Sequence, residues 1–532
     1  MAVRPPHPAR VTGPHAAGGR GGVPGADPAG PVDVAVLGGG PAGASAARLL
    51  SAWGRSVVLL TRPATTPPLA ESLPPSIDRL FDLFGVRISV EAAGFVRTTG
   101  NTVWWDGSGA RHEGFGDGAR GYQVVQRDLE GVLLGLAREA GAHVVEGSDV
   151  RRVEDRERPA AGSGRPATVF YGLSGASRSL EARWVLDCTG RTGVIAKRGL
   201  RRRERGPSTL ALVGVWERTG GWGLDDETHT LVESYEDGWA WSVPISSSVR
   251  YFTAMVDPRL TALERGGPIG GTYAAELAKT THISRLLGGA TRTRAPWACT
   301  ATPYDATRYA GPGFLLVGDA GSFIDPLSSF GVKKALASAW LAAVAVHTCL
   351  AAAEMTGPSL ALFERRERAI YDAYRRLSAG FSREAGQRYG HGFWSRRARQ
   401  VDELDRSGFT GEPDAAELRD NPAVLAAFAS LKASPGIRLR AAATPGFIEE
   451  PTVEGNRVVL ERRLIVPGWE AGVRHLRGVD LPALVEMAPG FGQVPDLFEA
   501  FAARHEEVTL PDFLGALSVL IAKGVLENRF GA

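Results

Sequence analysis

The stretch VDVAVLGGGPAGASAARLL, residues 32–50, decides the fold. Its apolar start predicts a buried parallel strand, followed by a glycine turn and an alanine-rich helix. Glycines serve the tight turn, the close approach of backbone to a pyrophosphate, and helix–strand packing. The helix N-terminus presents unpaired N–H groups to phosphates. The residues expected to bind a dinucleotide are Gly38, Gly40, Pro41, Ala42 and Gly43.

A second apolar strand, SVVLL at residues 56–60, completes the predicted βαβ unit. An acidic residue usually ends this strand and binds the adenosine ribose. Here Thr61 and Arg62 stand there instead. A threonine hydroxyl can still hydrogen-bond a ribose, but more weakly than a carboxylate. We therefore expect both residues at the cofactor site.

Bulk composition limits the class of protein. The 532 residues are 44% hydrophobic and 22% charged, which is typical of a globular protein of roughly three units. A net charge of +3 argues for neither nucleic acid nor an anionic membrane as partner. Three scattered cysteines fit a reducing cytoplasm and predict neither a disulfide framework nor a metal site. The apolar run at residues 335–353 is interpreted as a buried helix, with no integral membrane contact.

Three later motifs favour a flavin over a nicotinamide. LVGDAGSFIDP, residues 316–326, resembles the flavoprotein monooxygenase motif whose aspartate, here Asp319 after Gly318, binds the flavin ribityl chain. Arg127 heads an amphipathic helix, as in those enzymes. Asp187 and Gly190 of RWVLDCTG resemble their Asp-x-x-Gly segment near the dinucleotide. FAD is the cofactor that this resemblance implies.

The chain further resembles flavin-dependent halogenases and related monooxygenases. GWAWSVPI, residues 238–245, matches their Trp-x-Trp-x-Ile-Pro signature, with valine for isoleucine. AESLPPSIDRLFDLFGV, residues 70–86, is similar to their Glu-Ser-Leu-x-Pro segment beside the flavin, and it contains Ser72. DPLSSFGVKKALASA, residues 325–339, resembles the segment that covers the isoalloxazine. It adds three expected cofactor contacts, Pro326, Gly331 and Val332.

One position departs from the halogenase pattern. Within FVRTTGNTVWWDG, residues 95–107, alignment of the tryptophans puts Thr98 where halogenases carry a catalytic lysine. In the family that ammonium group captures or polarises the oxidised halogen, and a threonine hydroxyl is neither charged nor basic. Arg97 cannot replace it, because neighbours on a strand point to opposite faces. The sequence thus predicts a relative without the halogenating lysine.

The resemblance then implies an FAD-dependent monooxygenase, in which a flavin C4a-hydroperoxide and O2 hydroxylate an indole- or phenol-type substrate. A dry aromatic chamber suits that reaction. Trp239 and Trp241 are expected as its walls, Glu71 as a proton-transfer group, and Thr98 as the altered catalytic position. Further candidates by residue type alone are Trp104, Trp105, Trp297, His112, His229 and His391. No second glycine motif is present, so reduced flavin would come from a partner reductase or from brief docking of NADH.

The predicted fold is α/β. It comprises a tail at 1–31 expected to be disordered, a Rossmann-like FAD-binding domain of the aromatic-hydroxylase type at 32–207 and 301–380, an antiparallel β-sheet substrate domain at 208–300, and a mainly helical region at 381–532. Residues 382–399 mix aromatics with arginines, and predict either a helix capping the site or a solvated basic helix. Residues 461–532 resemble a winged-helix-like module. Its seven Lys and Arg against ten Asp and Glu oppose DNA binding and favour a protein partner, such as a protein-borne substrate.

Three alternatives remain open from the sequence. The first is a halogenase with a displaced lysine, Lys333 or Lys334. The second is a reductase of the geranylgeranyl-reductase type, which shares the fold but lacks the paired tryptophans. The third is a non-catalytic flavoprotein, for which Thr61 is the best argument.

Overall fold

The strand and helix predicted from residues 32–50 are β1 (Val32–Leu37) and α1 (Pro41–Ala52) in a computed structural model of the chain. The structure describes residues 30–63, 65–107, 109–154, 166–203, 206–261, 263, 267–399, 418, 421–441, 446–505 and 508–529. The tail expected to be disordered therefore falls almost wholly outside the described residues.

β1 lies in an eight-stranded sheet whose centre is parallel. The order is β20-β21-β11-β1-β2-β8, and β9 and β10 extend β11 as an antiparallel flap. Pairing of Val34 with Val57 and of Leu37 with Asp187 brings the carboxyl ends of three strands together beside the glycine turn. The other strands are β2 (Val57–Thr61), β8 (His143–Glu146), β9 (Asp149–Glu154), β10 (Ala167–Leu173), β11 (Ala176–Asp187), β20 (Ala310–Gly311) and β21 (Phe314–Leu316). This is the predicted Rossmann-like core.

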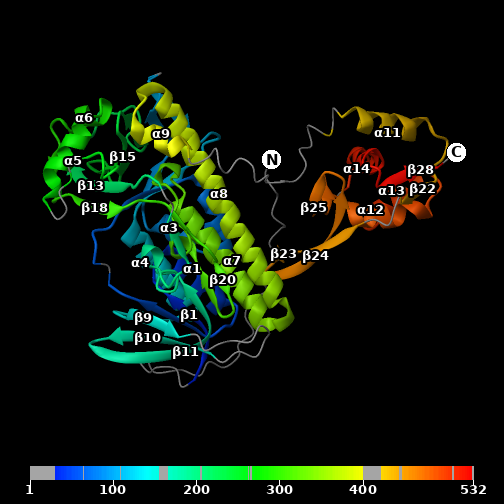
Figure 1. Cartoon of the computed structure of the whole chain (residues 1–532), viewed down its shortest axis with the longest axis horizontal. Helices are drawn as coiled ribbons and strands as arrows, with labels where there is room; N and C mark the ends of the chain where they lie inside the picture. Colours follow the sequence, from blue (N-terminus) through cyan, green and yellow to red (C-terminus); the bar gives the residue numbers. More distant parts are fainter. Residues whose placement is uncertain are drawn as a thin grey trace.

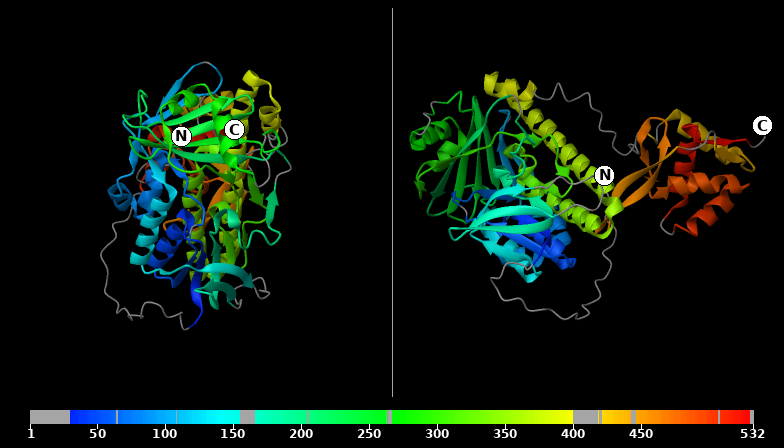
Figure 2. Two further views of the ribbon diagram at one scale, coloured as in Figure 1. Left: turned by 90° about the vertical axis from the view of Figure 1, so that its left-hand side faces the viewer. Right: turned by 60° about the horizontal axis from the view of Figure 1, so that its bottom comes forward.

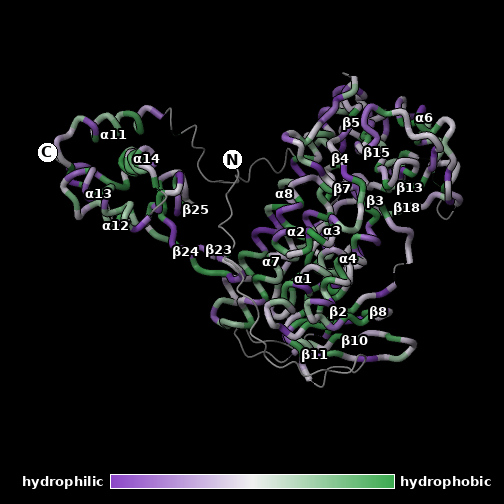
Figure 3. Tube along the Cα trace, turned by 180° about the vertical axis from the view of Figure 1, so that it is seen from behind, coloured by the Kyte–Doolittle hydropathy of each residue, from purple (hydrophilic) through white to green (hydrophobic). Residues whose placement is uncertain are grey.

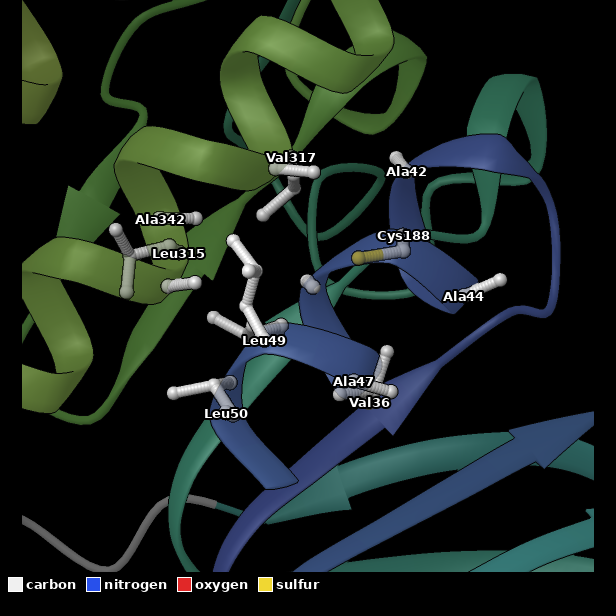
Figure 4. Close-up of a cluster of buried hydrophobic side chains, with 14 of the residues drawn as sticks. Val36, Ala42, Ala44, Ala47, Leu49, Leu50, Cys188, Leu315, Val317 and Ala342 are labelled. Carbon is white, nitrogen blue, oxygen red and sulfur yellow. The ribbon is translucent and has the colours of Figure 1, made fainter. Parts of the chain in front are cut away.

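Helices α1, α4 (Gln126–Glu139) and α7 (Gly331–Ala351) pack around this core. Figure 4 shows Val36, Leu49, Leu315 and Ala342 gathered between strand and helices. In the described part of the chain, α7 is the one helix long and apolar enough to cross a membrane. However, 78% of its most apolar window is buried, against α1 and α8, as expected for a core helix.

The substrate sheet is a second eight-stranded sheet, ordered β17-β13-β16-β15-β14-β5-β6, with β18 on β13. α5 (Ile269–Ala278) and α6 (His282–Leu287) contact one of its faces. Its strands are β5 (Gly100–Trp104), β6 (Arg111–Gly114), β13 (Leu210–Glu217), β14 (Thr230–Tyr235), β15 (Gly238–Pro244), β16 (Val249–Val256), β17 (Thr291–Arg292) and β18 (Trp297–Thr300). The expected boundaries of 208–300 are thus too narrow. β5 and β6 come from the first flavin segment, because β5 pairs in parallel with β14 across more than a hundred residues of chain.

A small three-stranded sheet, ordered β3-β7-β4, is built from the segments around Glu71 and Thr98. A short pair, β12 with β19, joins the loop after Asp187 to the segment that returns to the flavin domain. The elements of this region are β3 (Ala70–Leu73), α2 (Asp78–Phe84), α3 (Arg87–Ala92), β4 (Val96–Thr98), β7 (Gly121–Val125), β12 (Arg201–Arg203) and β19 (Tyr304–Ala306).

The long helix α8 (Thr356–Tyr389) runs beside α7, and the short helix α9 (Gly392–Ala398) follows it (Figure 1). At its far end α8 reaches the substrate sheet, where Trp105 Nε1 donates to the carbonyl oxygen of Phe381 at 2.9 Å. At its near end it contacts the hairpin of β23 (Phe447–Glu454) and β24 (Arg457–Val466), which the right view of Figure 2 shows between the main body and the C-terminal module. The ion pair Arg365–Glu450, at 2.8 Å, fastens that contact.

The C-terminal module has its own hydrophobic core, which extends from Val424 to Leu526. Its elements are α11 (Pro422–Ala433), β22 (Leu439–Ala441), β25 (Trp469–Val473), β26 (His475–Leu476), β27 (Val479–Asp480), α12 (Leu481–Met487), α13 (Val494–Ala502), α14 (Leu510–Ala522) and β28 (Leu526–Asn528). One boundary needs correction: the module begins before residue 461, because α11 packs on the apolar helix α14 (Figure 3). The mainly helical region also contains a three-stranded sheet, β23-β24-β25.

Candidate functional site

The glycine turn after β1 leaves no room for side chains. Gly38 has φ +102°, and a Cβ there would lie 2.4 Å from the Cys188 carbonyl oxygen. A Cβ on Gly43 would lie 1.9 Å from the carbonyl oxygen of Gly38. Pro41 opens α1, and no side chain caps that helix. The backbone N–H groups of its first turn are thus left for an anion, which fits the pyrophosphate of FAD.

The end of β2 places Thr61 beside this turn. A Cβ on Gly39 would lie 2.6 Å from Thr61 Oγ1, so the hydroxyl faces the cradle. Arg62 Nη2 donates to Thr192 Oγ1 at 2.9 Å. Glu130 of α4, which the sequence did not single out, also reaches the cradle, with Oε1 3.5 Å from the Cβ position of Gly40. Burial raises the pKa of Glu130. The sequence could have pointed to Glu130, because it lies three residues after Arg127 and therefore on the same face of the predicted helix.

Asp187 is fully buried and organises the loop around Gly190. One carboxylate oxygen accepts from Thr189 N at 3.1 Å and from Thr189 Oγ1 at 2.5 Å. The other accepts from Ile195 N at 2.7 Å. The carboxylate is thus used by the chain's own loop. That loop contacts the turn of Gly318–Ala320, so Asp187 acts on the cofactor site by positioning.

The Gly318–Ala320 turn presents Asp319, whose side chain is 29% exposed. Burial raises the pKa of this carboxyl, against the opposing effects of Lys334 and Arg191. Beyond the turn, Asp325 caps a 3₁₀ turn that begins at Pro326 by accepting from Leu327 N at 3.0 Å. α7 then begins at Gly331 and Val332 without a side-chain cap, which leaves a second helix N-terminus unpaired near the predicted flavin segment.

Glu71 and Ser72 lie on β3, between the two large sheets. Burial, and secondly the charge of Asp319, raise the pKa of Glu71 to about 7. Ser72 Oγ accepts from Thr230 Oγ1 at 2.9 Å, and Thr230 Oγ1 accepts from Gln123 Nε2 at 2.9 Å. This polarity leaves the Ser72 hydroxyl hydrogen free to donate toward a ligand. Gln123 and Thr230 are residues that the sequence reasoning missed.

Arg127 lies in the first turn of α4 and is exposed; its Nη2 donates to the Thr66 carbonyl oxygen at 3.2 Å. Burial raises the pKa of both Glu130 and Tyr251, and the charge of Arg127 opposes that rise in each.

The paired tryptophans belong to a buried aromatic cluster on the face of the substrate sheet opposite α5 and α6, which is the predicted position of the chamber. Trp239 and Trp241 meet edge to face with ring centroids 6.1 Å apart, and Trp105 meets Trp239 at 6.4 Å. The Trp241 Nε1 atom is buried without a hydrogen-bond partner in the described structure. Trp297 packs edge-on against Tyr251 in the same cluster. Phe323 within the flavin motif, Leu327 directly after it, and Ala70 beside Glu71 belong to the same cluster, so the predicted cofactor loop contacts the tryptophan cluster.

α9 packs on this cluster. Trp394 is 1% exposed, lies 5.3 Å from the Trp105 ring, and donates from Nε1 to the Tyr235 carbonyl oxygen at 3.0 Å. Of the two interpretations of residues 382–399, a wholly solvated basic helix is wrong, because Phe393 and Trp394 are buried in the aromatic cluster. A capping role at the active site stays a prediction. Trp394 and Phe381 are chamber residues that no spacing rule singled out.

Trp104 is not a chamber wall. It stacks on His282 of α6, with centroids 4.5 Å apart and planes at 7°, on the other face of the sheet. Alternation along β5 explains this, because only one of two consecutive strand residues can face the chamber.

The histidine candidates also have structural roles. His229 contacts Thr102 and Thr99 on the α6 side, and His112 contacts Thr102. His391 Nδ1 accepts from Phe393 N at 3.1 Å and caps α9.

Thr98 is 0% exposed, and its hydroxyl donates to the Gly100 carbonyl oxygen at 3.0 Å. As expected, Arg97 points away from it, donating to the Arg120 carbonyl oxygen and lying over the Tyr122 ring. The chain has six lysines: Lys197, Lys279, Lys333, Lys334, Lys432 and Lys523. Of these, Lys334 is completely buried behind the flavin motif, and Lys333 Nζ donates to Ser76 Oγ at 2.7 Å.

A family model described as an FAD binding domain matches residues 31–355, more than half of the chain. The protein therefore belongs to this family of FAD-binding flavoproteins. Tryptophan 2-halogenase of Chondromyces crocatus is 34% identical over 330 residues, which cover 60% of this chain and 61% of the relative. The flavin-dependent halogenase rdc2 of Metacordyceps chlamydosporia is 31% identical over 343 residues, or 60% and 65% of the two chains. Each alignment spans less than two thirds of the relative.

Solved structures extend the likeness of fold to the C-terminal module. The flavin-dependent halogenase CmlS superposes with a TM-score of 0.70 at 22% identity, over 94% of this chain and 96% of its own. The peptidyl tryptophan dihydroxylase QhpG superposes with 0.64 at 22%, over 93% and 100%. The myxobacterial chondrochloren halogenase CndH gives 0.62 at 27%, over 70% and 88%. FAD is thus the cofactor of the family, and the glycine cradle fits it.

Proposed function

We propose that this protein is an FAD-dependent monooxygenase that hydroxylates an aromatic ring of indole or phenol type, using O2. The observation that carries the proposal is the aromatic cluster beside the predicted flavin segment. Tryptophans gather on one face of the substrate sheet, α9 packs on them, and Glu71, whose pKa burial raises to about 7, lies on β3, which contacts β15 of that sheet.

In this proposal the bound FAD supplies the activated oxygen, and the chain supplies everything else. Trp239 and Trp241 hold the flat substrate, and the unpartnered Trp241 Nε1 donates to a polar substituent on it. Trp105 and Trp394 exclude water by filling the space beneath α9. Glu71, poised at a pKa of about 7, takes up the proton that the hydroxylated ring or its heteroatom loses.

The substrate could be carried by a protein. Two observations favour this: a fold shared along its whole length with a peptidyl tryptophan dihydroxylase, and a C-terminal module with its own core. Reduced flavin would come from a partner reductase.

Halogenation is the second candidate function, because the curated relatives are halogenases. Lys333 would then serve as the displaced lysine. Burial lowers its pKa, which favours the nucleophilic amine. Against this, its ammonium group contacts Ser76 and lies over the Phe330 ring, and neither residue is in the aromatic cluster.

The test uses the full chain loaded with FAD, a flavin reductase with NADH, and isotopically labelled O2. Indoles, phenols and tryptophan-containing peptides are supplied with and without chloride or bromide, and products are identified by mass. We expect incorporation of oxygen from O2 whether or not halide is present. Trp241→Phe should raise KM, while Trp104→Phe, on the opposite face of the sheet, should not. A halide-dependent product that disappears in Lys333→Met would overturn the monooxygenase proposal in favour of the second candidate.

A further inference from the structure

A lysine with no exposed surface lies directly behind the flavin motif. Lys334, in the first turns of α7, has a side-chain exposure of 0%. Its Nζ donates to the Gly318 carbonyl oxygen at 3.1 Å and to the Ser322 carbonyl oxygen at 2.5 Å, and lies 3.7 Å from Asp319 Oδ1. A buried ammonium group is costly to desolvate, so its contacts need an explanation.

One helical turn further along α7, Ser338 also binds Gly318. Ser338 Oγ accepts from Gly318 N at 2.9 Å. Lys334 and Ser338 are four residues apart and therefore share a helix face. Both backbone polar groups of Gly318 are thus bonded to side chains of α7, and Lys334 also holds the far end of the turn at Ser322. Gly318 has φ +62°, so its position depends on contacts that fix an uncommon backbone conformation.

The third member comes from α8. Glu367 is 1% exposed, and neither of its carboxylate oxygens has a hydrogen-bond partner in the described structure. The charge of Lys334 and the Ser338 hydroxyl are its stabilising polar neighbours. When ionised, a carboxylate at this buried position compensates the charge of the buried ammonium group.

We propose that Lys334, Ser338 and Glu367 form a buried clamp that holds the Gly318–Ser322 turn, and with it Asp319, in the FAD-binding conformation. Lys334 is a positioning residue in this clamp: it acts on the cofactor through Gly318, Ser322 and Asp319. The pattern Lys-x-x-x-Ser at the start of α7, with a glutamate on α8, is its sequence signature.

The test measures FAD affinity of the full apoprotein by flavin fluorescence, with thermal unfolding in parallel, at pH 8. Lys334→Met should raise the Kd for FAD about tenfold or more, because a charged hydrogen bond to each carbonyl is lost. The double variant Lys334→Met/Glu367→Gln should recover thermal stability, since no uncompensated carboxylate remains, but not FAD affinity. Lys432→Met, a lysine exposed on α11, is the matched control.

Ser338→Ala tests the clamp without changing any charge. It should raise the Kd for FAD several-fold and alter the fine structure of the bound flavin spectrum, because Gly318 N loses its acceptor. Wild-type FAD affinity in Ser338→Ala and in Lys334→Met would overturn the proposal. So would a double variant that regains FAD affinity together with stability, since the role would then be charge balance alone.

Discussion

Trp104 and Trp105 are neighbours in the sequence, yet their rings contact opposite faces of one sheet. Trp104 stacks on His282 beside α6, whereas Trp105 meets Trp394 of α9 in the chamber. Trp105 is 2% exposed and its Nε1 is hydrogen-bonded to α8. Substitutions at these two positions therefore distinguish the stability contributed by packing in the chamber from that contributed by packing on the opposite face of the sheet.

Replacing Trp105 by alanine should destabilise the protein far more than replacing Trp104. The first change removes a fully buried indole and its hydrogen bond, which costs about 3–5 kcal/mol, and the second removes one partly exposed stacking contact, at about 1 kcal/mol. Urea unfolding of the FAD-saturated protein measures both. Equal losses for the two variants would contradict the assignment of the faces.

Gly43→Ala should abolish FAD binding. The new methyl group would lie 1.9 Å from the Gly38 carbonyl oxygen, so the phosphate turn itself must move. Gly270→Ala on α5 is the control, because a Cβ there meets nothing within 4 Å. That variant should bind FAD normally and be stabilised by up to about 1 kcal/mol. FAD affinity by fluorescence titration checks both expectations, and tight binding by Gly43→Ala would refute the role given to this turn.

The parts of the fold that depend on local sequence could be predicted. The glycine cradle, β2, the buried helix α7 and the Gly318–Asp319 turn follow from periodicity and turn chemistry over short spans. The insertion of β5 into the substrate sheet could not, because its pairing partner is β14, far along the chain.

The residues of the site likewise divide into those that local sequence predicts and those that depend on tertiary contacts. The Trp239 and Trp241 signature is local, and both residues lie in the chamber. Trp394 and Gln123 reach the site through tertiary contacts, with α9 and β7 positioned by elements distant in sequence. Trp104, a candidate chamber wall that faces α6 instead, shows what the sequence could not predict. The sequence contains two adjacent tryptophans, but only the end of β5 determines which of them faces the chamber.

Glu71→Gln should change the pH profile of turnover. If the ionised carboxylate takes up a proton, kcat/KM of the wild type should rise with pH and level off above about 7, where Glu71 is ionised. The variant should lack this limb and lose roughly 100-fold in rate at pH 8. Steady-state rates measured from about pH 5.5 to about pH 9, on both sides of neutrality, test this. A wild-type profile that falls through pH 7 would make Glu71 an acid instead.

Thr98→Lys should not produce a robust halogenase. Thr98 is completely buried, and among the described residues its hydroxyl is hydrogen-bonded to the backbone of Gly100 and not to a carboxylate. A lysine there must therefore bury an ammonium group. We expect a lower thermal unfolding temperature and no halogenated product from indoles with bromide. Thr98→Val, which keeps the volume, is the control for stability. Efficient bromination by the lysine variant would show that the chamber retains a complete halide site.

Glu367→Gln should flatten the pH dependence of stability. Burial raises the pKa of Glu367 to about 7 from the ordinary glutamate value of 4.5, despite the lowering effects of Lys334 and Ser338, and Glu364 raises it further. Between these two values the folded protein binds more protons than the unfolded chain, so the free energy of unfolding of the wild type falls as pH rises and levels off above about 7. Glu71 contributes in the same direction and remains in the variant. The difference between wild type and variant should therefore change by on the order of 2–3 kcal/mol from pH 5 to pH 8. Urea unfolding of FAD-saturated protein across this range measures it, and parallel curves for the two proteins would contradict the raised pKa of Glu367.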